Sequence, residues 1–395
     1  MKNIDKIYQY LLMLLFFVVP FEHSARALPN ILLIALVVIF PFVTTRKSVL
    51  KIKKEWLSIV AFIALLALNT IIFGRHTDWG MLVKVLYVPL LLLLTSVSQN
   101  KNKLLAAFVY GVFLLFLTSS AMIGWQFFNQ NNFVLTNGEG VNDYLFGHRP
   151  YIGFMYVMAM FFAVYLLTVS NDKKHRVFYG ISAVCFAGFV FFIAARLSTL
   201  SVLLAVVLSF FYFSKKIKIP YQWITVALGL LVVLFYGLSD NLADRFFLNN
   251  EKINFVIAEP RYYIWDCAYQ IFPSEITQFL FGQGYENTEI ALVECYQQKE
   301  NFLDAEHKQW FIDGRFNTHN QFLDFFLSQG FIVVFLSICS FAYLLLRYRK
   351  KFFAIGLIGS LLLFFMVENV LTRQLGSILT AFLLCFVFSQ KGDNN

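Results

Sequence analysis

The chain has 395 residues, of which 59% are hydrophobic and only 14% are charged. A soluble domain carries about 45–50% apolar and about 25% charged residues, so this composition excludes a soluble enzyme, a disordered chain and a fibrous protein. It indicates an all-α polytopic membrane protein, whose 48 phenylalanines face lipid as well as the core. The net charge of +9 is then expected in short clusters at one membrane face and does not indicate nucleic-acid binding.

Membrane-spanning helices are predicted wherever roughly 20 mostly apolar residues follow one another, because that length crosses the hydrocarbon layer. About twelve stretches meet this pattern. They run over residues 7–22, 28–45, 55–73, 79–98, 104–128, 150–169, 176–195, 197–214, 221–239, 322–346, 352–371 and 375–390. The first stretch lacks a clean small-residue cleavage site, so we predict a span there rather than a signal peptide.

The loops between these stretches differ in charge. One set of loops carries most of the basic residues, and with twelve spans all of these residues fall on the same side. They are Lys2, Lys6, Arg46, Lys47, Lys51, Lys53, Lys54, Lys101, Lys103, Lys173, Lys174, Arg176, Lys215, Lys216, Lys218, Arg347, Arg349, Lys350, Lys351 and Lys391. The positive-inside rule makes this side the cytoplasm and predicts that both termini lie there.

One connection is much longer than the others and divides the chain into three parts. Residues 1–239 hold nine predicted spans, residues 240–321 form a large outer loop, and residues 322–395 hold three spans and a cytoplasmic C-terminus. The loop mixes aromatic, acidic and basic residues and is typical of short helices. It is long enough to cap a cavity but small for an independent domain.

Within this loop, helices are predicted over residues 262–271 and 286–299, with a turn at Gly282-Gln283-Gly284 between them. Cys267 and Cys295 are its only two cysteines. An outer compartment permits a disulfide, and in the chain-entropy model this one would stabilise the fold by roughly 3–4 kcal/mol. Two buried thiols are the alternative.

His319 lies in Asn317-Thr318-His319-Asn320, where the long loop re-enters the membrane. Because histidine titrates near neutrality, this imidazole can take a proton from a hydroxyl. The alternative is a hydrogen-bonded histidine at the membrane boundary.

Topology does not explain several cations on the outer side. Arg196 occupies a very short turn between two apolar runs, and Arg261 follows Pro260 in the long loop. A guanidinium offers a planar donor fork suited to phosphate oxygens, so both are candidates for binding a phosphorylated ligand. The alternative for each is a snorkelling side chain or an ion pair.

Three further sites carry charge. Lys84, inside a span near its outer end, either snorkels or lines a polar cavity. Arg149, in Gly147-His148-Arg149-Pro150, is another cation at the outer boundary. Glu368 lies within a predicted span and Arg373 follows about one turn later. We interpret these two as a buried or snorkelling pair rather than as catalytic groups.

Other chemistries lack their motifs. There is no Walker loop, no GxGxxG after a strand and no HExxH. The six histidines do not cluster at the spacing of metal ligands. We therefore expect no cofactor and no metal.

The order of these features resembles the O-antigen ligase family, whose signature region is shared with O-antigen polymerases and some protein O-oligosaccharyltransferases. The resemblance covers roughly residues 180–345 by motif and the whole chain by hydropathy. The matching residues are Arg196, Arg261 with Trp265, Gly282 and Gly284, His319 with Asn320, and Gln329-Gly330.

The resemblance implies a GT-C-like glycosyltransferase of the bacterial inner membrane, with its active site at the periplasmic face. Such an enzyme would move a glycan from undecaprenyl diphosphate to a hydroxyl on lipid A–core. By this resemblance, Arg196 and Arg261 hold the diphosphate, His319 is the general base, and Lys84 and Arg149 assist at the phosphate or the carrier.

Three functions fit the pattern. A ligase would use lipid A–core as the acceptor, a polymerase would use another carrier-linked repeat, and a flippase or transporter would only move the glycolipid. A flippase should carry cations through the full depth of the membrane, whereas the unexplained cations here gather at the outer face. This distribution favours chemistry there, and we favour the ligase.

Overall fold

The computed structural model describes residues 2–43, 54–98, 100–129, 144–193, 195–213 and 259–390. The described part is helical and contains no strand. Its α-helices are α1 (Lys2–Val18), α2 (Ala27–Val43), α4 (Lys54–Ile72), α5 (Trp79–Ser96), α6 (Lys101–Asn129), α8 (Arg149–Val169), α9 (Lys173–Phe192), α10 (Arg196–Phe213), α14 (Pro260–Gln270), α15 (Ile276–Phe281), α16 (Tyr285–Gln298), α17 (Ala305–Gly314), α18 (Gln321–Gln329), α19 (Phe331–Arg347), α20 (Phe352–Phe365) and α21 (Gln374–Ser389). Two short 3₁₀ helices, η1 (Val19–Phe21) and η2 (His76–Asp78), precede α2 and α5.

Many of these helices have the length and apolarity of membrane spans. Five are long and apolar enough to cross a membrane by length and composition, and six shorter apolar helices accompany them. The chain is therefore a helical membrane protein. The predicted span at 221–239 lies outside the described residues, so the number of twelve stays a prediction.

The large core is built around α8, which packs against α6, α9, α10, α20 and α21. Aromatic rings fill the spaces between these helices. Phe16 of α1 stacks on Phe382 of α21 with ring centroids 3.6 Å apart, and Phe154 of α8 stacks on Phe364 of α20 at 4.5 Å. Such ring pairs bury much apolar area in preferred geometries and hold the start of α8 in a fixed place.

Two of the predicted spans are shorter than expected. The apolar run at 322–346 is broken at Gly330 into α18 and α19, and the run at 352–371 ends its helix at Phe365. Gly330 has φ +85°, and a Cβ there would lie 2.3 Å from the carbonyl oxygen of Leu280. A close backbone contact therefore requires glycine at this point and ends the helix. Residues 366–373 form a non-helical loop between α20 and α21.

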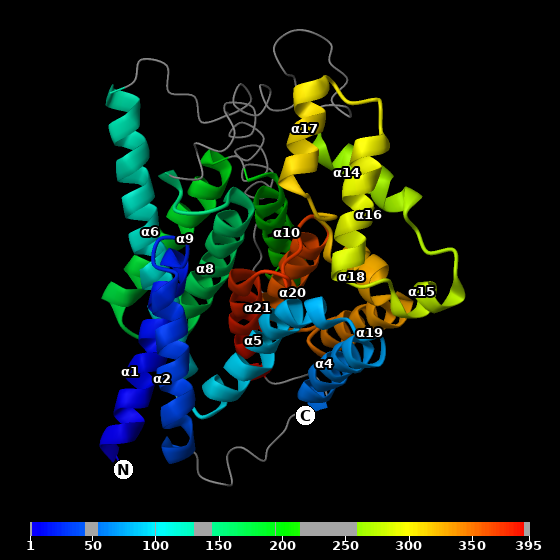
Figure 1. Ribbon diagram of the computed structural model, residues 1–395. Coiled ribbons are helices and arrows are strands. Elements are labelled where there is room, and N and C mark those ends of the chain that lie inside the picture. Colours follow the sequence, from blue (N-terminus) through cyan, green and yellow to red (C-terminus); the bar gives the residue numbers. More distant parts are fainter. Residues whose placement is uncertain are drawn as a thin grey trace.

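The long connecting segment, described here from residue 259 to 320, folds as four helices, α14 to α17. In Figure 1, α14, α16 and α17 lie at the end of the molecule far from the N-terminus. The segment has its own small core around Tyr263, Tyr296 and Phe311. A disulfide joins Cys267 of α14 to Cys295 of α16, with Cα atoms 5.7 Å apart. The sequence allowed either a disulfide or two buried thiols here, and the structure contains the disulfide.

Arg75 attaches this segment to the membrane helices. Its guanidinium donates to the carbonyl oxygens of Phe281 (2.9 Å), Gly282 (2.5 Å) and Ser328 (3.2 Å). The planar fork suits such convergent acceptors. The sequence pattern assigns no role to Arg75, and this contact gives it a structural one.

Asp78 adds a second link at the same place. Its carboxylate accepts from the backbone N–H of Tyr285, at the start of α16 (2.9 Å), and from the side chain of Gln329 (2.9 Å). A carboxylate at a helix N-terminus also interacts favourably with the helix dipole. The turn Gly282-Gln283-Gly284 thus lies directly against the end of α18, where Gln283 and Gly284 donate to backbone carbonyls.

Replacing Gly282 with alanine should destabilise the protein. Gly282 has φ +70°, and an added Cβ would lie 2.3 Å from the carbonyl carbon of Ser328. We expect a loss of more than about 1 kcal/mol in the free energy of unfolding, seen as a lower Tm of the purified protein in detergent. Gly180→Ala in α9 is the control, because a Cβ there meets no atom within 4 Å. An unchanged Tm for Gly282→Ala would contradict the close approach.

Candidate functional site

Arg261 lies in the first turn of α14, directly after Pro260, which suits the first position of a helix. Its guanidinium reaches in two directions. Nη1 pairs with Glu259 at 2.8 Å, while Nη2 donates to the carbonyl oxygen of Val367 at 3.2 Å and lies 3.5 Å from Glu368 Oε1. Its Nε is buried and donates to no group in the described part of the chain. The Arg261 guanidinium is therefore held in place, while its Nε–H has no acceptor among the described residues.

His319 occupies an unusual backbone position. Its φ is +44°, in the left-handed region that a residue with a side chain seldom adopts. The backbone N–H of His319 donates to the side chain of Asn317 at 3.1 Å, which stabilises the turn. Imidazole Nδ1 lies 3.4 Å from Glu368 Oε2. Backbone strain of this kind concentrates at functional sites, and here it directs the ring toward a carboxylate.

Glu368 joins these two residues. Its side chain is only 8% exposed, and its two oxygens face different partners, Oε1 toward Arg261 and Oε2 toward His319. The sequence interpretation of Glu368 as a partner of Arg373 was wrong. Glu368 lies in the loop after α20, and the Arg373 guanidinium lies over the Tyr151 ring, 5.7 Å from its centroid. An acidic residue in an apolar run was the only sequence signal for this role.

Asn369, the next residue in the loop, fixes the turn that carries His319. Its Oδ1 accepts from the backbone N–H of Asn320 at 2.8 Å and from the hydroxyl of Thr318 at 3.3 Å. Trp265 of α14 donates from its indole to the carbonyl oxygen of Thr318 at 2.9 Å. Two separate parts of the chain, the loop after α20 and helix α14, therefore hold one turn, and the sequence pattern had assigned no role to Asn369.

Asn320 serves a different purpose from a catalytic group. It is the N-cap of α18, and its Oδ1 accepts from the backbone N–H groups of Phe322 and Leu323, both at 3.0 Å. This is the usual way in which an asparagine side chain begins a helix. The His-Asn motif thus combines a strained histidine with a helix start.

A cleft of about 490 Å³ opens beside Arg261. Arg149 and Pro150, at the start of α8, line it, as do Leu197 and Ser198 of α10. Arg149 is buried, so two of the predicted cations face one cleft. Arg196 begins α10 between the lining residues Ala195 and Leu197, but its side chain lies outside the described residues.

Lys84 stands apart from this group. It is exposed on α5 and does not line the 490 Å³ cleft that Arg149 and Arg261 share. Its role at a phosphate or a carrier lipid stays a prediction. The structure therefore brings together Arg149, Arg261 and His319 through the cleft and Glu368, and it does not add Lys84 to them.

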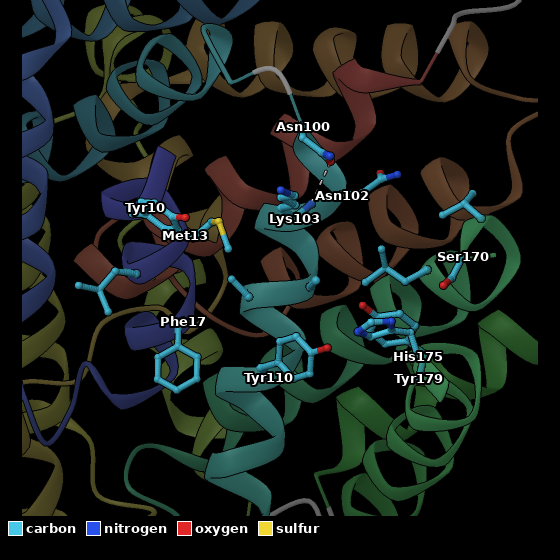
Figure 2. Close-up of a pocket in the computed structure, with 15 residues that line it drawn as sticks. Tyr10, Met13, Phe17, Asn100, Asn102, Lys103, Tyr110, Ser170, His175 and Tyr179 are labelled. Atoms are coloured by element: carbon cyan, nitrogen blue, oxygen red, sulfur yellow. Dashed lines mark hydrogen bonds between the residues drawn. The ribbon is translucent and has the colours of Figure 1, made fainter. Parts of the chain in front are cut away.

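A cavity of larger volume than this cleft lies elsewhere in the described part of the chain. It has a volume of about 800 Å³ and is lined mainly by apolar residues of α1, α6, α8 and α9. Figure 2 shows Asn100, Lys103, Ser170 and His175 around its polar part. None of the predicted site residues lines it, so volume alone does not locate the chemistry.

The arrangement at Glu368 suits acid–base and phosphate chemistry. The Glu368 carboxylate lies 3.4 Å from His319 Nδ1, which makes no hydrogen bond within the described residues. A slightly closer approach would let the carboxylate hold the ring and would leave the other nitrogen to accept a proton. Arginines beside a cleft suit a phosphorylated ligand. Among residues 259–390 and the other described ranges, no group of three His, Cys, Asp or Glu side chains gathers as metal ligands would.

Comparison with known families adds independent evidence. Residues 181–338 match the O-antigen ligase family model. The O-antigen ligase signature predicted from the sequence is thereby confirmed. The matched region contains Arg196, Arg261 and His319, whereas Arg149 and Glu368 lie outside it. No curated protein matches the chain in a sequence search.

Replacing Asn369 with leucine should loosen the turn at His319. Leucine has a similar shape but cannot accept a hydrogen bond, so the backbone N–H of Asn320 loses its partner, at a cost of about 1–3 kcal/mol. Hydrogen exchange followed by mass spectrometry should show faster exchange over residues 317–323. Asn287→Leu is the control, because Asn287 is exposed and donates only to the carbonyl oxygen of Gln283. Unchanged exchange in Asn369→Leu would rule out this role.

Proposed function

We propose that this protein is a metal-independent glycosyltransferase that moves a glycan from undecaprenyl diphosphate to a hydroxyl of lipid A–core. The observation that carries the proposal is the Glu368 carboxylate, which contacts Arg261 on one side and His319 on the other at a cleft lined by two arginines. The O-antigen ligase signature over residues 181–338 supports the reaction class.

The donor carries its own activation, because the diphosphate is a good leaving group. In the proposed step, the acceptor oxygen forms a bond to the anomeric carbon of the glycan as the bond from that carbon to the diphosphate oxygen breaks. Arg261, Arg149 and Arg196 bind the diphosphate and stabilise the negative charge that develops on it. Lys84 makes a further contact to the phosphate or the carrier lipid in this proposal.

His319 acts as the general base in this step. Its Nε2 takes the proton of the acceptor hydroxyl, while Glu368 holds Nδ1–H and stabilises the imidazolium that forms. Glu368 is therefore a positioning residue that acts through His319. Because Glu368 also contacts Arg261, the base and the phosphate-binding group keep a fixed spacing.

A polymerase is the second candidate, since it would use the same donor and a carrier-linked repeat as the acceptor. Deleting the gene separates the two. Loss of surface polysaccharide with carrier-linked polymer still present identifies a ligase, whereas single repeats on the core identify a polymerase. A flippase is disfavoured because Arg149 and Arg261 share one cleft with a buried carboxylate nearby.

The proposed location is the bacterial inner membrane, with both termini in the cytoplasm and the site at the periplasmic face. Single cysteines placed by mutation should test this arrangement in whole cells. A membrane-impermeant maleimide should label position 306 in α17 and should not label position 349 after α19. The reverse pattern would overturn the topology and, with it, the proposed reaction at the periplasmic face.

His319→Ala should give a stable protein that no longer transfers glycan. Removing a general base lowers the rate about 10²–10⁴-fold, which an assay with purified donor and acceptor lipids would measure. His175→Ala, at an exposed histidine paired with Asp172, is the matched control and should transfer normally. A stable His319→Ala protein with near wild-type rate would refute the assignment of the base.

Arg261→Lys should behave differently from His319→Ala. A lysine keeps the charge but cannot reproduce the fork that contacts Glu259, Val367 and Glu368 together. We expect Arg261→Lys to bind the donor more weakly and to transfer glycan more slowly than the wild type, and to stay more active than Arg261→Ala. Donor KM and kcat measured separately would show this, and a pure kcat effect would contradict a role in donor binding.

A further inference from the structure

A second polar cavity lies on the other side of the first turn of α8. It has a volume of about 260 Å³. Four basic side chains line it, from three separate parts of the chain: His23 and Arg26 between η1 and α2, His148 before α8, and Arg373 before α21. The proposed function uses none of these four residues.

Two of these basic side chains lie close to each other, and a third is held against the cavity wall. The rings of His23 and His148 are 5.9 Å apart in an edge-on arrangement. The Arg373 guanidinium rests on the ring of Tyr151, which also lines the cavity. The neighbouring wall is fixed by Gln374, whose side chain donates to Asn30 Oδ1 at 2.5 Å.

One acidic residue, Glu22, shares this cavity. Burial raises the pKa of its carboxyl group, and the charges of Arg26 and His23 partly oppose that effect. When it is ionised, the Glu22 carboxylate offsets part of the positive charge of Arg26 beside it. An anion that enters competes with Glu22 for the same cations.

The loop of residues 366–373 connects this cavity to the proposed catalytic groups. Val367 lines the 490 Å³ cleft and accepts from Arg261, and Glu368 contacts His319. The carbonyl oxygen of Asn369 accepts from the hydroxyl of Tyr151 at 3.1 Å, and Arg373 then lines the second cavity. A single loop therefore passes from one cavity, past the histidine, to the other.

We propose that the second cavity binds a phosphate group on the headgroup of the acceptor lipid. This inference rests on the proposed function, because it assigns the second substrate of the same reaction. The cleft beside Arg261 serves the donor diphosphate, and the first turn of α8 separates the two cavities. Two anionic lipids can then be bound at once, with His319 between their headgroups.

The charge pattern favours phosphate over an uncharged sugar. Two arginines and two histidines from distant segments offer several N–H donors around one small volume, and arginine binds phosphate oxygens through paired hydrogen bonds. Gathering two arginines around one small cavity is electrostatically unfavourable unless anions join them, and Glu22 is the one acidic residue among the lining residues. Phosphate on lipid A and diphosphate on a second carrier lipid share this chemistry, and the experiment below separates them.

Binding to the purified protein in detergent provides the test, and it needs no catalysis. The probes are diphosphoryl lipid A, the same lipid after phosphatase treatment, and undecaprenyl diphosphate. Arg26→Gln and Arg373→Gln should each raise the Kd for diphosphoryl lipid A roughly tenfold, as expected for the loss of a charge-assisted contact. Neither should change the Kd for the dephosphorylated lipid.

Glu22→Gln should act in the opposite direction and tighten binding of the phosphorylated lipid, because it removes the competing carboxyl group. Arg315→Gln is the matched control. Arg315 is an exposed arginine that pairs with Glu289 and lies outside the cavity, so this change should leave every Kd as in the wild type. Opposite effects at two sites of one cavity are hard to obtain from a general loss of folding.

The outcomes distinguish lipid A from a second carrier lipid as the source of the phosphate. They also distinguish failure of the phosphate-binding site from failure of the proposed glycosyltransferase reaction. If Arg26→Gln weakens only lipid A binding, the acceptor is lipid A. If it instead removes one of two bound equivalents of undecaprenyl diphosphate, the acceptor is a second carrier lipid, as a polymerase requires. If phosphatase treatment and all three cavity variants leave binding unchanged, the second cavity is not a phosphate site. Phosphate-dependent binding without glycan transfer by the wild type would reject the glycosyltransferase and keep the binding site.

Discussion

A buried carboxylate needs compensation, and the site is organised around that requirement. Glu368 is almost fully removed from solvent, and a lone charge in such a place costs several kcal/mol unless it is paired and hydrogen-bonded. Arg261 and His319 supply the pairing from two other parts of the chain. The need to satisfy one side chain therefore fixes the relative positions of α14, the turn before α18 and the loop after α20.

Close backbone contacts help to position the long connecting segment, beside the side-chain packing of its aromatic residues. The turn at Gly282 and the helix end at Gly330 come so close that neither tolerates a Cβ. Arg75 then bonds the carbonyl oxygens that this contact brings together. With the disulfide between α14 and α16, these contacts make a rigid support for Arg261.

Sequence reasoning found the features that depend on local pattern. The apolar helices follow from hydropathy and the turn at Gly282 from glycine spacing, whereas the catalytic and binding roles of Arg261 and His319 stay predictions. It could not find Glu368 as a partner of both, because that contact joins residues far apart in the sequence. It also missed the break at Gly330, since the apolar pattern continues through it and only the neighbouring backbone of Leu280 requires a glycine. The role of Arg75 was hidden for a similar reason, because backbone carbonyls leave no sequence signal.

The order in which the site residues occur along the chain has a consequence for biosynthesis. Helices α8 and α10 supply part of the lining of the 490 Å³ cleft, whereas Arg261, His319 and Glu368 all follow residue 259 in the chain. A growing polypeptide therefore makes α8 and α10 first and acquires Arg261, His319 and Glu368 only later in synthesis. Incomplete chains that stop before α20 would contain Arg261 and His319 but would lack Val367 and Glu368, the loop residues that contact them.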